Sequence, residues 1–323
     1  MEKRIWILGL TIGIIVSVHL NSAISADYPT KPIEYICPFG AGGPTSLANR
    51  IIADKLSQLL GQPVVVINKP GAGGAIASAY IARAKPDGYT IGDVTSSGNG
   101  VTLALRPGVT YKNSDFELLG QYGTHFLAMA VKEDAPWKTV KDLAEYAKRN
   151  PGVLKYGSSG VGSATQLCME LFKLTAGKLK IDHTPFKSGP EITAALLGGH
   201  IHTGTFTWGT VKAVYDAKKV RVLAVSVPAE ELPGIPTFEQ AGYPEVNLTG
   251  FYGTAVPKGL PGEILNKLRD ACAKTFQDPK TKEAFRNIGL TPDYKTPEEF
   301  AKFMEERIIL YKRIGQEANI TLD

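Results

Sequence analysis

Short β-prone stretches alternate with apolar residues at helical spacing along most of the chain. The first complete example spans residues 33–60 and is typical of a strand, a glycine-rich turn over residues 38–44 and a helix. We expect Thr45 or Ser46 to cap this helix and Gly61 to end it. Because such a turn leaves backbone N–H groups free at the positive end of a helix dipole, the pattern predicts an anion site.

A second strand, glycine turn and helix follow in residues 154–175. The turn contains Gly160 and Gly162, and the helix opens with the capping box Ser163-x-x-Gln166. Both turns have the format G-x-G-x-x-T. Two such units, about half a chain apart, predict two α/β lobes whose strand ends face a shared cleft.

The alternation continues between and after these units, so we expect parallel sheets. The further predicted strands are residues 63–68, 90–95, 181–186, 201–206 and 221–227, and the further helices are residues 75–83, 138–149, a stretch ending at Leu197, and 211–217. Residues 69–74 form another glycine turn, which we interpret as close packing or a cleft wall, because no Gly-Lys-Ser/Thr follows. Residues 96–100 are predicted to be a polar loop.

Two extended apolar stretches, residues 116–131 and 248–256, are predicted to cross between the lobes. The remainder of the chain is predicted to be helical, and these helices are expected to pack on the first lobe. Their residues are 261–276, 281–288 and 297–313, the last with Thr296 as its cap.

Composition narrows the class of protein. The 323 residues are 43% hydrophobic and 21% charged, which is ordinary for a globular chain with two cores. The formal charge of +5 includes no basic run of the kind that binds nucleic acid, so we expect no nucleic-acid partner. Three widely spaced cysteines without a C-x-x-C motif indicate neither a zinc site nor a disulfide framework, although one pair could be oxidised.

The first 26 residues have the features of a signal peptide. Lys3 and Arg4 form a basic start, residues 5–20 are apolar, and small residues lead to an expected cleavage near Ala26. An uncleaved anchor is the alternative, but the apolar run is shorter than the ~20 residues that a span needs. We therefore predict export to the periplasm.

The motifs of the sequence give little indication of a catalytic site or a metal site. Serines beside glycines cap helices more often than they act as nucleophiles, and the chain has no G-x-S-x-G elbow. His200 and His202 lie on one face of a predicted strand, with His183 as a third candidate ligand, but such histidines are usually hydrogen-bonded strand residues. We predict no metal site, no cofactor and no catalytic residue.

Aromatic residues and one lysine lie near predicted strand ends. Most of the aromatic residues are expected in the core, with one or two lining the cleft; they are Phe39, Phe126, Phe206, Trp208, Phe251 and Tyr252. Lys187 follows a strand and could meet a second carboxylate, although a solvated lysine is the more common case.

Five stretches together resemble the tripartite tricarboxylate transporter receptor family, the Bug or TctC type of periplasmic solute-binding protein. They are YPTKPIEYICPFGAGGPTSLANRIIADKL, LGQPVVVINKPGAGGAIASAYIARAKPDGYTI, YGSSGVGSATQL, HTPFKSGPEITAALLGGHI and LAVSVPAEELPGIPTFEQAGYP. The resemblance implies an α/β, two-domain, type II periplasmic-binding-protein fold with a central ligand cleft and crossing hinge strands. We accordingly expect domain 1 in residues 27–127 plus 254–323 and domain 2 in residues 128–253.

The resemblance also implies that the two glycine loops hold a ligand carboxylate, largely through backbone amides and water. These loops are residues 39–46 and 158–164, where the anion site was predicted from the pattern. The expected ligand-binding residues are Phe39, Gly40, Ala41, Gly42, Gly43, Pro44, Thr45, Ser46, Ser96, Ser97, Ser158, Ser159, Val161, Gly162, Ser163, Ala164, Thr205, Phe206, Thr207 and Trp208.

Two positions depart from the family pattern. Ser46 stands where an aspartate is common, which weighs against amino-acid ligands because a partner for an ammonium group is lost. His202 also replaces an acidic residue. The function we predict is that of a monomeric solute-binding protein, not an enzyme, which closes its lobes on a small carboxylate and delivers it to membrane permease subunits. An exported enzyme acting on a carboxylic acid, or a sensor that signals to a kinase, are the alternatives.

Overall fold

The computed structural model describes residues 28–317 and residue 320, so the predicted signal segment lies outside the described residues. Ten strands form one curved sheet in the order β2-β1-β3-β9-β4-β7-β5-β6, with β8 and β10 also paired to β4. The strands are β1 (Ile33–Cys37), β2 (Val64–Asn68), β3 (Thr90–Thr95), β4 (Phe116–Lys132), β5 (Lys155–Ser158), β6 (Asp182–Pro185), β7 (Thr203–Thr207), β8 (Val220–Val225), β9 (Thr249–Pro257) and β10 (Thr291–Lys295).

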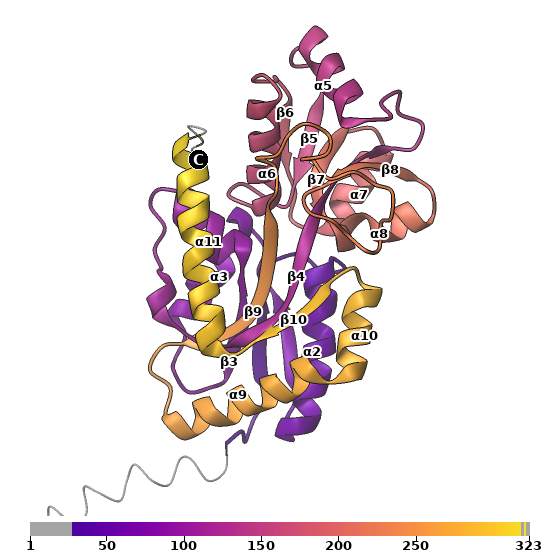
Figure 1. The fold of residues 1–323 in the computed structure, drawn as a ribbon. Coiled ribbons are helices and arrows are strands. Elements are labelled where there is room, and N and C mark those ends of the chain that lie inside the picture. Colours follow the sequence, from indigo (N-terminus) through magenta and orange to yellow (C-terminus); the bar gives the residue numbers. More distant parts are fainter. Residues whose placement is uncertain (1–27, 318–319, 321–323) are drawn as a thin grey trace, which may run out of the picture.

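Helices pack around this sheet, and the molecule has two lobes (Figure 1). The helices are α2 (Pro44–Leu60), α3 (Ala75–Arg83), α4 (Thr102–Leu105), α5 (Val140–Arg149), α6 (Ala164–Thr175), α7 (Gly189–Leu197), α8 (Trp208–Asp216), α9 (Gly262–Gln277), α10 (Pro279–Asn287) and α11 (Pro297–Glu317). We call the part built on β1, β2, β3, β9 and β10 the first lobe, and the part built on β5 to β8 the second lobe. The structure is thus the mixed α/β, two-lobed arrangement that the sequence predicted.

Strand β4 runs through both lobes and connects them (Figure 1). Residues 116–126 pair with β9, and residues 127–132 pair with β7 and β8. All three pairings are antiparallel, as is that of β3 with β9, so the expectation of purely parallel sheets was wrong. The reason is that β4 carries the chain from the first lobe to the second while β9 carries it back. Parallel pairing holds within each lobe, between β1 and its neighbours and between β5 and its neighbours.

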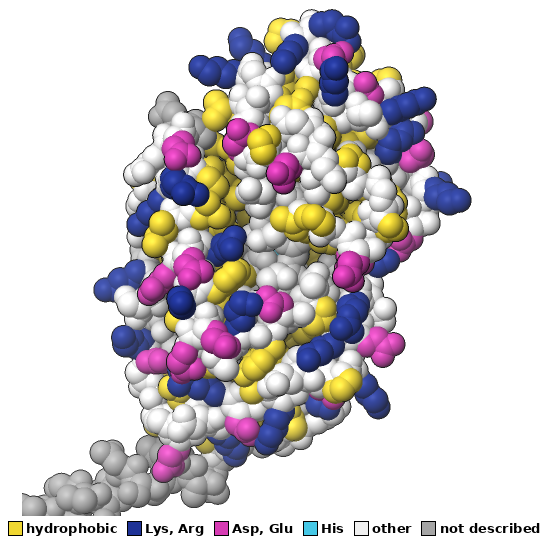
Figure 2. All heavy atoms as spheres, in the orientation of Figure 1, with side chains coloured by type: hydrophobic (Ala, Val, Ile, Leu, Met, Phe, Trp, Pro, Cys, Tyr) yellow, Lys and Arg dark blue, Asp and Glu magenta, His cyan; other side chains and the backbone are white. Residues whose placement is uncertain are grey.

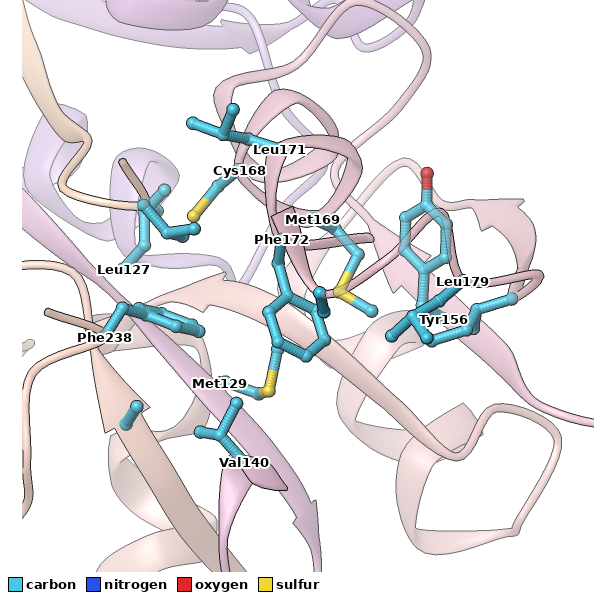
Figure 3. Close-up of a cluster of buried hydrophobic side chains, with 14 of the residues drawn as sticks. Leu127, Met129, Val140, Tyr156, Cys168, Met169, Leu171, Phe172, Leu179 and Phe238 are labelled. Carbon is cyan, nitrogen blue, oxygen red and sulfur yellow. The ribbon is translucent and has the colours of Figure 1, made fainter. Parts of the chain in front are cut away.

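Each lobe has its own apolar core. In the second lobe, Met129 of β4, Val140 of α5 and Phe172 of α6 are all buried and pack with Phe238 (Figure 3). Helix α5 packs in this core with the one face on which its apolar residues recur. Thr139 is its N-cap, and Thr139 Oγ1 accepts a hydrogen bond from the Asp142 N–H at 3.1 Å. The core thereby fixes where the strand ends and helix starts of this lobe lie.

Helix α2 begins earlier than predicted, because its N-cap lies two residues before Thr45, the first of the two predicted caps. Gly43 is the N-cap without a side-chain hydrogen bond, and Pro44 occupies the first turn, so the prediction of Thr45 or Ser46 as cap was wrong. Proline suits this position because it has no N–H to satisfy and its φ is already helical. The prediction that Gly61 ends α2 is confirmed, since Gly61 has φ +71°.

The second glycine turn behaves largely as predicted. Ser163 caps α6, its Oγ accepting from the Gln166 N–H at 3.2 Å. The Gln166 side chain, however, accepts from the Gly162 N–H at 2.8 Å, one residue before the position that a capping box would give. Two hydrogen bonds, one made by the Gln166 N–H and one by the Gln166 side chain, therefore connect the turn with the start of α6.

Residues 96–101 are a wide helical turn of the π type that continues into α4, so the prediction of a polar loop was wrong. Thr95 Oγ1 accepts from the Gly98 N–H at 3.1 Å, and the buried Asn99 Oδ1 accepts from Ser78 Oγ at 3.0 Å. Polar groups of the turn are thus hydrogen-bonded to other protein groups and not to water. Ser96 and Ser97 are buried as a result.

The C-terminal helices divide between the lobes. Helices α9 and α10 pack with α2 on the first lobe, as predicted. Helix α11 begins at the predicted cap, where Thr296 Oγ1 accepts from the Glu299 N–H at 3.3 Å. Its Phe300 packs in the first lobe, but its Tyr311 joins the cluster of the second lobe, so α11 spans both (Figure 1).

The surface carries charge of both signs. On the face shown in Figure 2, Lys and Arg side chains are interspersed with Asp and Glu side chains. Among the described residues, no helix has the length and apolar character that crossing a membrane requires.

Candidate functional site

A cavity lies between the two lobes at the point where the strands of both lobes end. Its volume of about 30 Å³ is room for roughly two water molecules. It is lined by Phe39, Gly43, Pro44, Thr45, Thr95, Ser96, Ser97, His125, Ser159, Ala164, Thr165, Lys187, Ser188, Gly189, Ile192, Thr207, Thr210 and Tyr252.

Four helices begin at this cavity. Helices α2 and α6 reach it with Thr45 and Ala164, and helices α7 and α8 reach it with Gly189 and with Thr207, the residue before α8. The first N–H groups of a helix have no partner within the helix, and its dipole is positive there. The sequence predicted two such helix starts, and the structure brings four to one cavity.

The remaining polar groups at the cavity are mostly hydroxyls. Serine and threonine side chains come from both lobes, among them Thr45, Ser97 and Ser159. Within this lining there is no Asp or Glu, and Lys187 is its one permanently charged side chain. The site therefore favours an anion through dipoles and hydrogen bonds more than through formal charge.

One end of the cavity is formed by the crossing strands. His125 of β4 pairs directly with Gly250 of β9, and the His125 ring lies 4.5 Å from the Tyr252 ring, centroid to centroid. Burial lowers the pKa of His125 to about 3, so its imidazole is neutral near pH 7. Ser96 lies at the same end, and neither Ser96 Oγ nor His125 Nδ1 has a hydrogen-bond partner among the described residues.

The lobes touch each other around the cavity. The Gly40 N–H donates to the Lys187 carbonyl at 2.8 Å, and the Ala164 N–H donates to Ser97 Oγ at 3.1 Å. Thr102 Oγ1 of the first lobe also donates to the Gly162 carbonyl of the second, at 3.1 Å.

The third glycine turn, residues 69–74, takes part in this contact. A Cβ atom placed on Gly73 would lie 2.8 Å from the Val161 carbonyl oxygen, so only glycine fits here without a shift. The prediction that this turn serves close packing is confirmed, and its packing partner is the second glycine loop.

Nine of the predicted ligand-binding residues line the cavity: Phe39, Gly43, Pro44, Thr45, Ser96, Ser97, Ser159, Ala164 and Thr207. The other predicted residues are outside this lining: Gly40, Ala41, Gly42, Ser46, Ser158, Val161, Gly162, Ser163, Thr205, Phe206 and Trp208. Several of them support the lining residues. Ser46 Oγ accepts from Asn68 Nδ2 at 3.1 Å, Thr205 Oγ1 donates to the Thr165 carbonyl at 2.7 Å, and Phe206 belongs to the second lobe's core.

Sequence reasoning missed part of the lining: Thr95, His125, Thr165, Ser188, Gly189, Ile192 and Thr210. A polar residue inside an apolar crossing strand was the available signal for His125. Lys187 and Tyr252 were considered, and both line the cavity; Phe39 is the second of the aromatic residues that do so. The prediction that most of the aromatic residues near strand ends lie in the core is confirmed by the burial of Phe126, Phe206, Trp208 and Phe251.

Two further histidines, His183 and His202, make local hydrogen bonds. His183 Nε2 and Ser158 Oγ share a hydrogen bond of 2.6 Å, and His202 Nδ1 accepts from the Lys155 N–H at 3.0 Å. His202 is outside the cavity lining.

A buried carboxyl group lies behind the cavity. Asp93 of β3 accepts hydrogen bonds from the Tyr35 hydroxyl at 2.7 Å, the Tyr122 hydroxyl at 2.9 Å and Asn49 Nδ2 at 2.9 Å. Burial raises its pKa to about 7, although these hydrogen bonds oppose the shift. The Tyr122 ring is stacked on Tyr252, 5.9 Å away between centroids, so this group is one aromatic layer from the cavity.

Two α/β lobes joined by crossing strands, with helix N-termini converging on a cavity between them, define a periplasmic-binding-protein fold of the type II class. Residues 48–320 match the model of the tripartite tricarboxylate transporter family receptor, so the chain belongs to that family. It is 31% identical to the protein BugT of Bordetella pertussis, in an alignment that covers 100% of this chain and 99% of BugT.

Solved structures agree with this assignment. A structure described as a periplasmic transporter superposes with a TM-score of 0.86 at 38% identity, covering 92% of this chain and 100% of the other. The Rpa4515 protein of R. palustris, described with adipate, superposes with a TM-score of 0.86 at 28% identity, covering 91% of this chain and 99% of the other.

Proposed function

We propose that this protein is a monomeric periplasmic receptor that captures a small organic or aromatic carboxylate and delivers it to the permease subunits of a tripartite tricarboxylate transporter. The observation that carries the proposal is the convergence of four helix N-termini on one cavity whose lining contains no Asp or Glu. Membership of the receptor family and the adipate named with the Rpa4515 structure support a carboxylate as the ligand.

The physical basis is electrostatic. A carboxylate that leaves water loses strong hydrogen bonds, and it stays bound only where N–H and O–H donors replace them. The starts of α2 and α6 supply such donors from opposite lobes. Each lobe alone presents only part of the donor set, so the lobes close because the anion is held better by both.

Closure requires bending where the chain passes between lobes. The proposed hinge lies in β4 near residues 124–130, where its partner changes from β9 to β7 and β8, and in β9. Delivery to a permease follows from this cycle, because the closed form presents a surface that the open form lacks. Export is supported by the basic and apolar residues at the start of the chain, with cleavage near Ala26.

The test is titration calorimetry of the mature chain with mono-, di- and tricarboxylates, together with thermal unfolding. A bound acid at 100 times its dissociation constant should add ~2.7 kcal/mol to the free energy of unfolding. The acid should be recovered unchanged after incubation, as followed by NMR. If no carboxylate binds, the proposal fails; if the bound acid is converted, an enzyme replaces the receptor. Co-purification with permease subunits in the presence of the acid, and not with a sensor kinase, tests the delivery step.

A further inference from the structure

Two polar side chains at the cavity are buried and lack a partner. Ser96 is 1% exposed and His125 is 4% exposed. Neither Ser96 Oγ nor His125 Nδ1 has a hydrogen-bond partner within the part of the chain that the structure describes. Leaving a buried polar atom unsatisfied destabilises the folded protein, so two such side chains at one cavity indicate a group that the bound state supplies.

Both side chains converge on the same place. A Cβ atom built on Gly250 would lie 2.0 Å from His125 Nε2 and 2.6 Å from Ser96 Oγ. The imidazole edge that carries Nε2 and the Ser96 hydroxyl therefore lie side by side, and together they occupy the space that a side chain at position 250 would fill. They come from different elements, β4 and the helical turn after β3, and both belong to the cavity lining.

The chemistry of this pair differs from that of the helix N-termini. A neutral imidazole offers one donor and one acceptor, and a serine hydroxyl can donate and accept. Lys187, the charged side chain of the lining, belongs to the loop whose carbonyl accepts from the Gly40 N–H. The Ser96–His125 pair thus offers mixed hydrogen bonding without formal charge, which matches a hydroxyl group better than a second carboxylate.

We propose that Ser96 and His125 bind a hydroxyl group of the ligand, and that the protein selects hydroxy acids over acids that lack this group. The carboxylate lies at the helix N-termini, and the hydroxyl donates to one member of the pair and accepts from the other. This inference rests on the proposed function, because it assigns a second contact in the same cavity.

Matched pairs of acids test this selectivity. Dissociation constants are measured by calorimetry for malate against succinate and for 3-hydroxybutyrate against butyrate. The hydroxy acid of at least one pair should bind about tenfold more tightly, since its hydroxyl gains two hydrogen bonds that the other acid cannot make. Each comparison holds the carbon skeleton constant, so the difference reports the hydroxyl.

Variants assign the selectivity to this pair. Ser96→Ala and His125→Leu should each reduce the preference to within about threefold, whereas His125→Gln, which keeps a donor and an acceptor, should retain part of it. The matched control is Ser97→Ala. Ser97 Oγ already accepts from the Ala164 N–H, so its loss should weaken both acids of a pair equally.

The outcomes separate the two proposals. If acids bind but the wild-type protein does not distinguish the members of any pair, or if Ser96→Ala and Ser97→Ala change the preference alike, the hydroxyl contact is wrong while the carboxylate receptor stands. If no acid binds, both are wrong. Thermal unfolding of His125→Leu checks that the variant folds, and the Ser96→Ala result decides the question should it not fold.

Discussion

Gly160 of the second lobe lies against the backbone of Gly73 in the first, so closely that a Cβ atom on Gly160 would come within 3.1 Å of the Gly73 nitrogen. Both glycines have positive φ values, 113° and 60°. The lobes therefore meet at this point through backbone alone. A side chain at either position would act as a wedge, and because neither residue lines the cavity, the wedge would act on closure and not on ligand contacts.

Gly73→Ala is expected to weaken acid binding by about tenfold or more, because each 1.4 kcal/mol lost from the closed form is a factor of ten in affinity. Calorimetry measures the affinity, and small-angle scattering with saturating acid measures compaction. Gly61→Ala is the control: Gly61 has φ +71° but no atom within 4 Å of its Cβ position, so it should lose stability without losing affinity. Equal effects of the two substitutions on affinity would contradict a wedge.

The absence of Asp and Glu from the cavity lining gives a second prediction. Ser159→Asp places a carboxylate among the donors that are proposed to hold the ligand. Two like charges about 4 Å apart repel by ~4 kcal/mol at an effective dielectric constant of 20, so acid binding should fall by at least about a hundredfold. Ser159→Asn, of the same size but neutral, should lose far less. Similar affinities for the two variants would place the bound carboxylate elsewhere.

The strand-turn-helix units were predictable because each depends on neighbours in sequence. Ser163 precedes apolar residues at helical spacing, and it caps α6 as expected. The antiparallel pairing of β4 with β7 was not predictable in this way, because it depends on where the chain re-enters each lobe. The turn after β3 was misjudged for a related reason: Asn99 stabilises it through Ser78, 21 residues away in sequence.

In the candidate site, too, the residues that depend on local sequence were predicted, and those that depend on distant contacts were not. Thr45 and Ser97 were identified from glycine-rich or polar segments that follow strands. The starts of α7 and α8 were not identified, because the sequence around Ser188 and Thr210 does not indicate which helix ends share a cavity. His125 was missed because it lies within a strand, and only the pairing with Gly250 shows how the imidazole is accommodated, in the space that a side chain at position 250 would fill.

Helix caps provide a third prediction, with a control in the same lobe. Ser163→Ala and Thr139→Ala each remove an N-cap oxygen, from α6 and α5 respectively. Each should lower the free energy of unfolding by about 1 kcal/mol. Of these two helices, only α6 begins at the cavity, so only Ser163→Ala should also weaken acid binding. Denaturant unfolding and calorimetry give the two numbers, and a loss of affinity in Thr139→Ala would show that the effect is one of general stability.

The buried Asp93 predicts a dependence of stability on pH. Burial raises its pKa from 3.8 to about 7, so the folded state binds this proton more tightly than the unfolded state does. The stability that the protonated form provides is fully present below pH 3.8 and is lost as the pH rises through 7. His125 acts in the opposite direction, because its pKa is lowered by burial from 6.5 to about 3 and its stabilising contribution is lost as the pH falls below 6.5.

The Asp93→Asn variant isolates the contribution of the carboxyl group, because His125 is common to both proteins and cancels in the difference. Relative to this variant, the wild-type protein should lose up to ~4 kcal/mol of unfolding free energy between pH 4 and pH 7, at 1.36 kcal/mol per pKa unit. Above about pH 8 the difference should be constant, since Asp93 is then ionised in both states. Urea unfolding at intervals of half a pH unit measures it. A difference that is flat from pH 4 to 7, or that rises with pH, would mean that the Tyr35, Tyr122 and Asn49 hydrogen bonds outweigh burial and keep this carboxylate ionised in the folded protein.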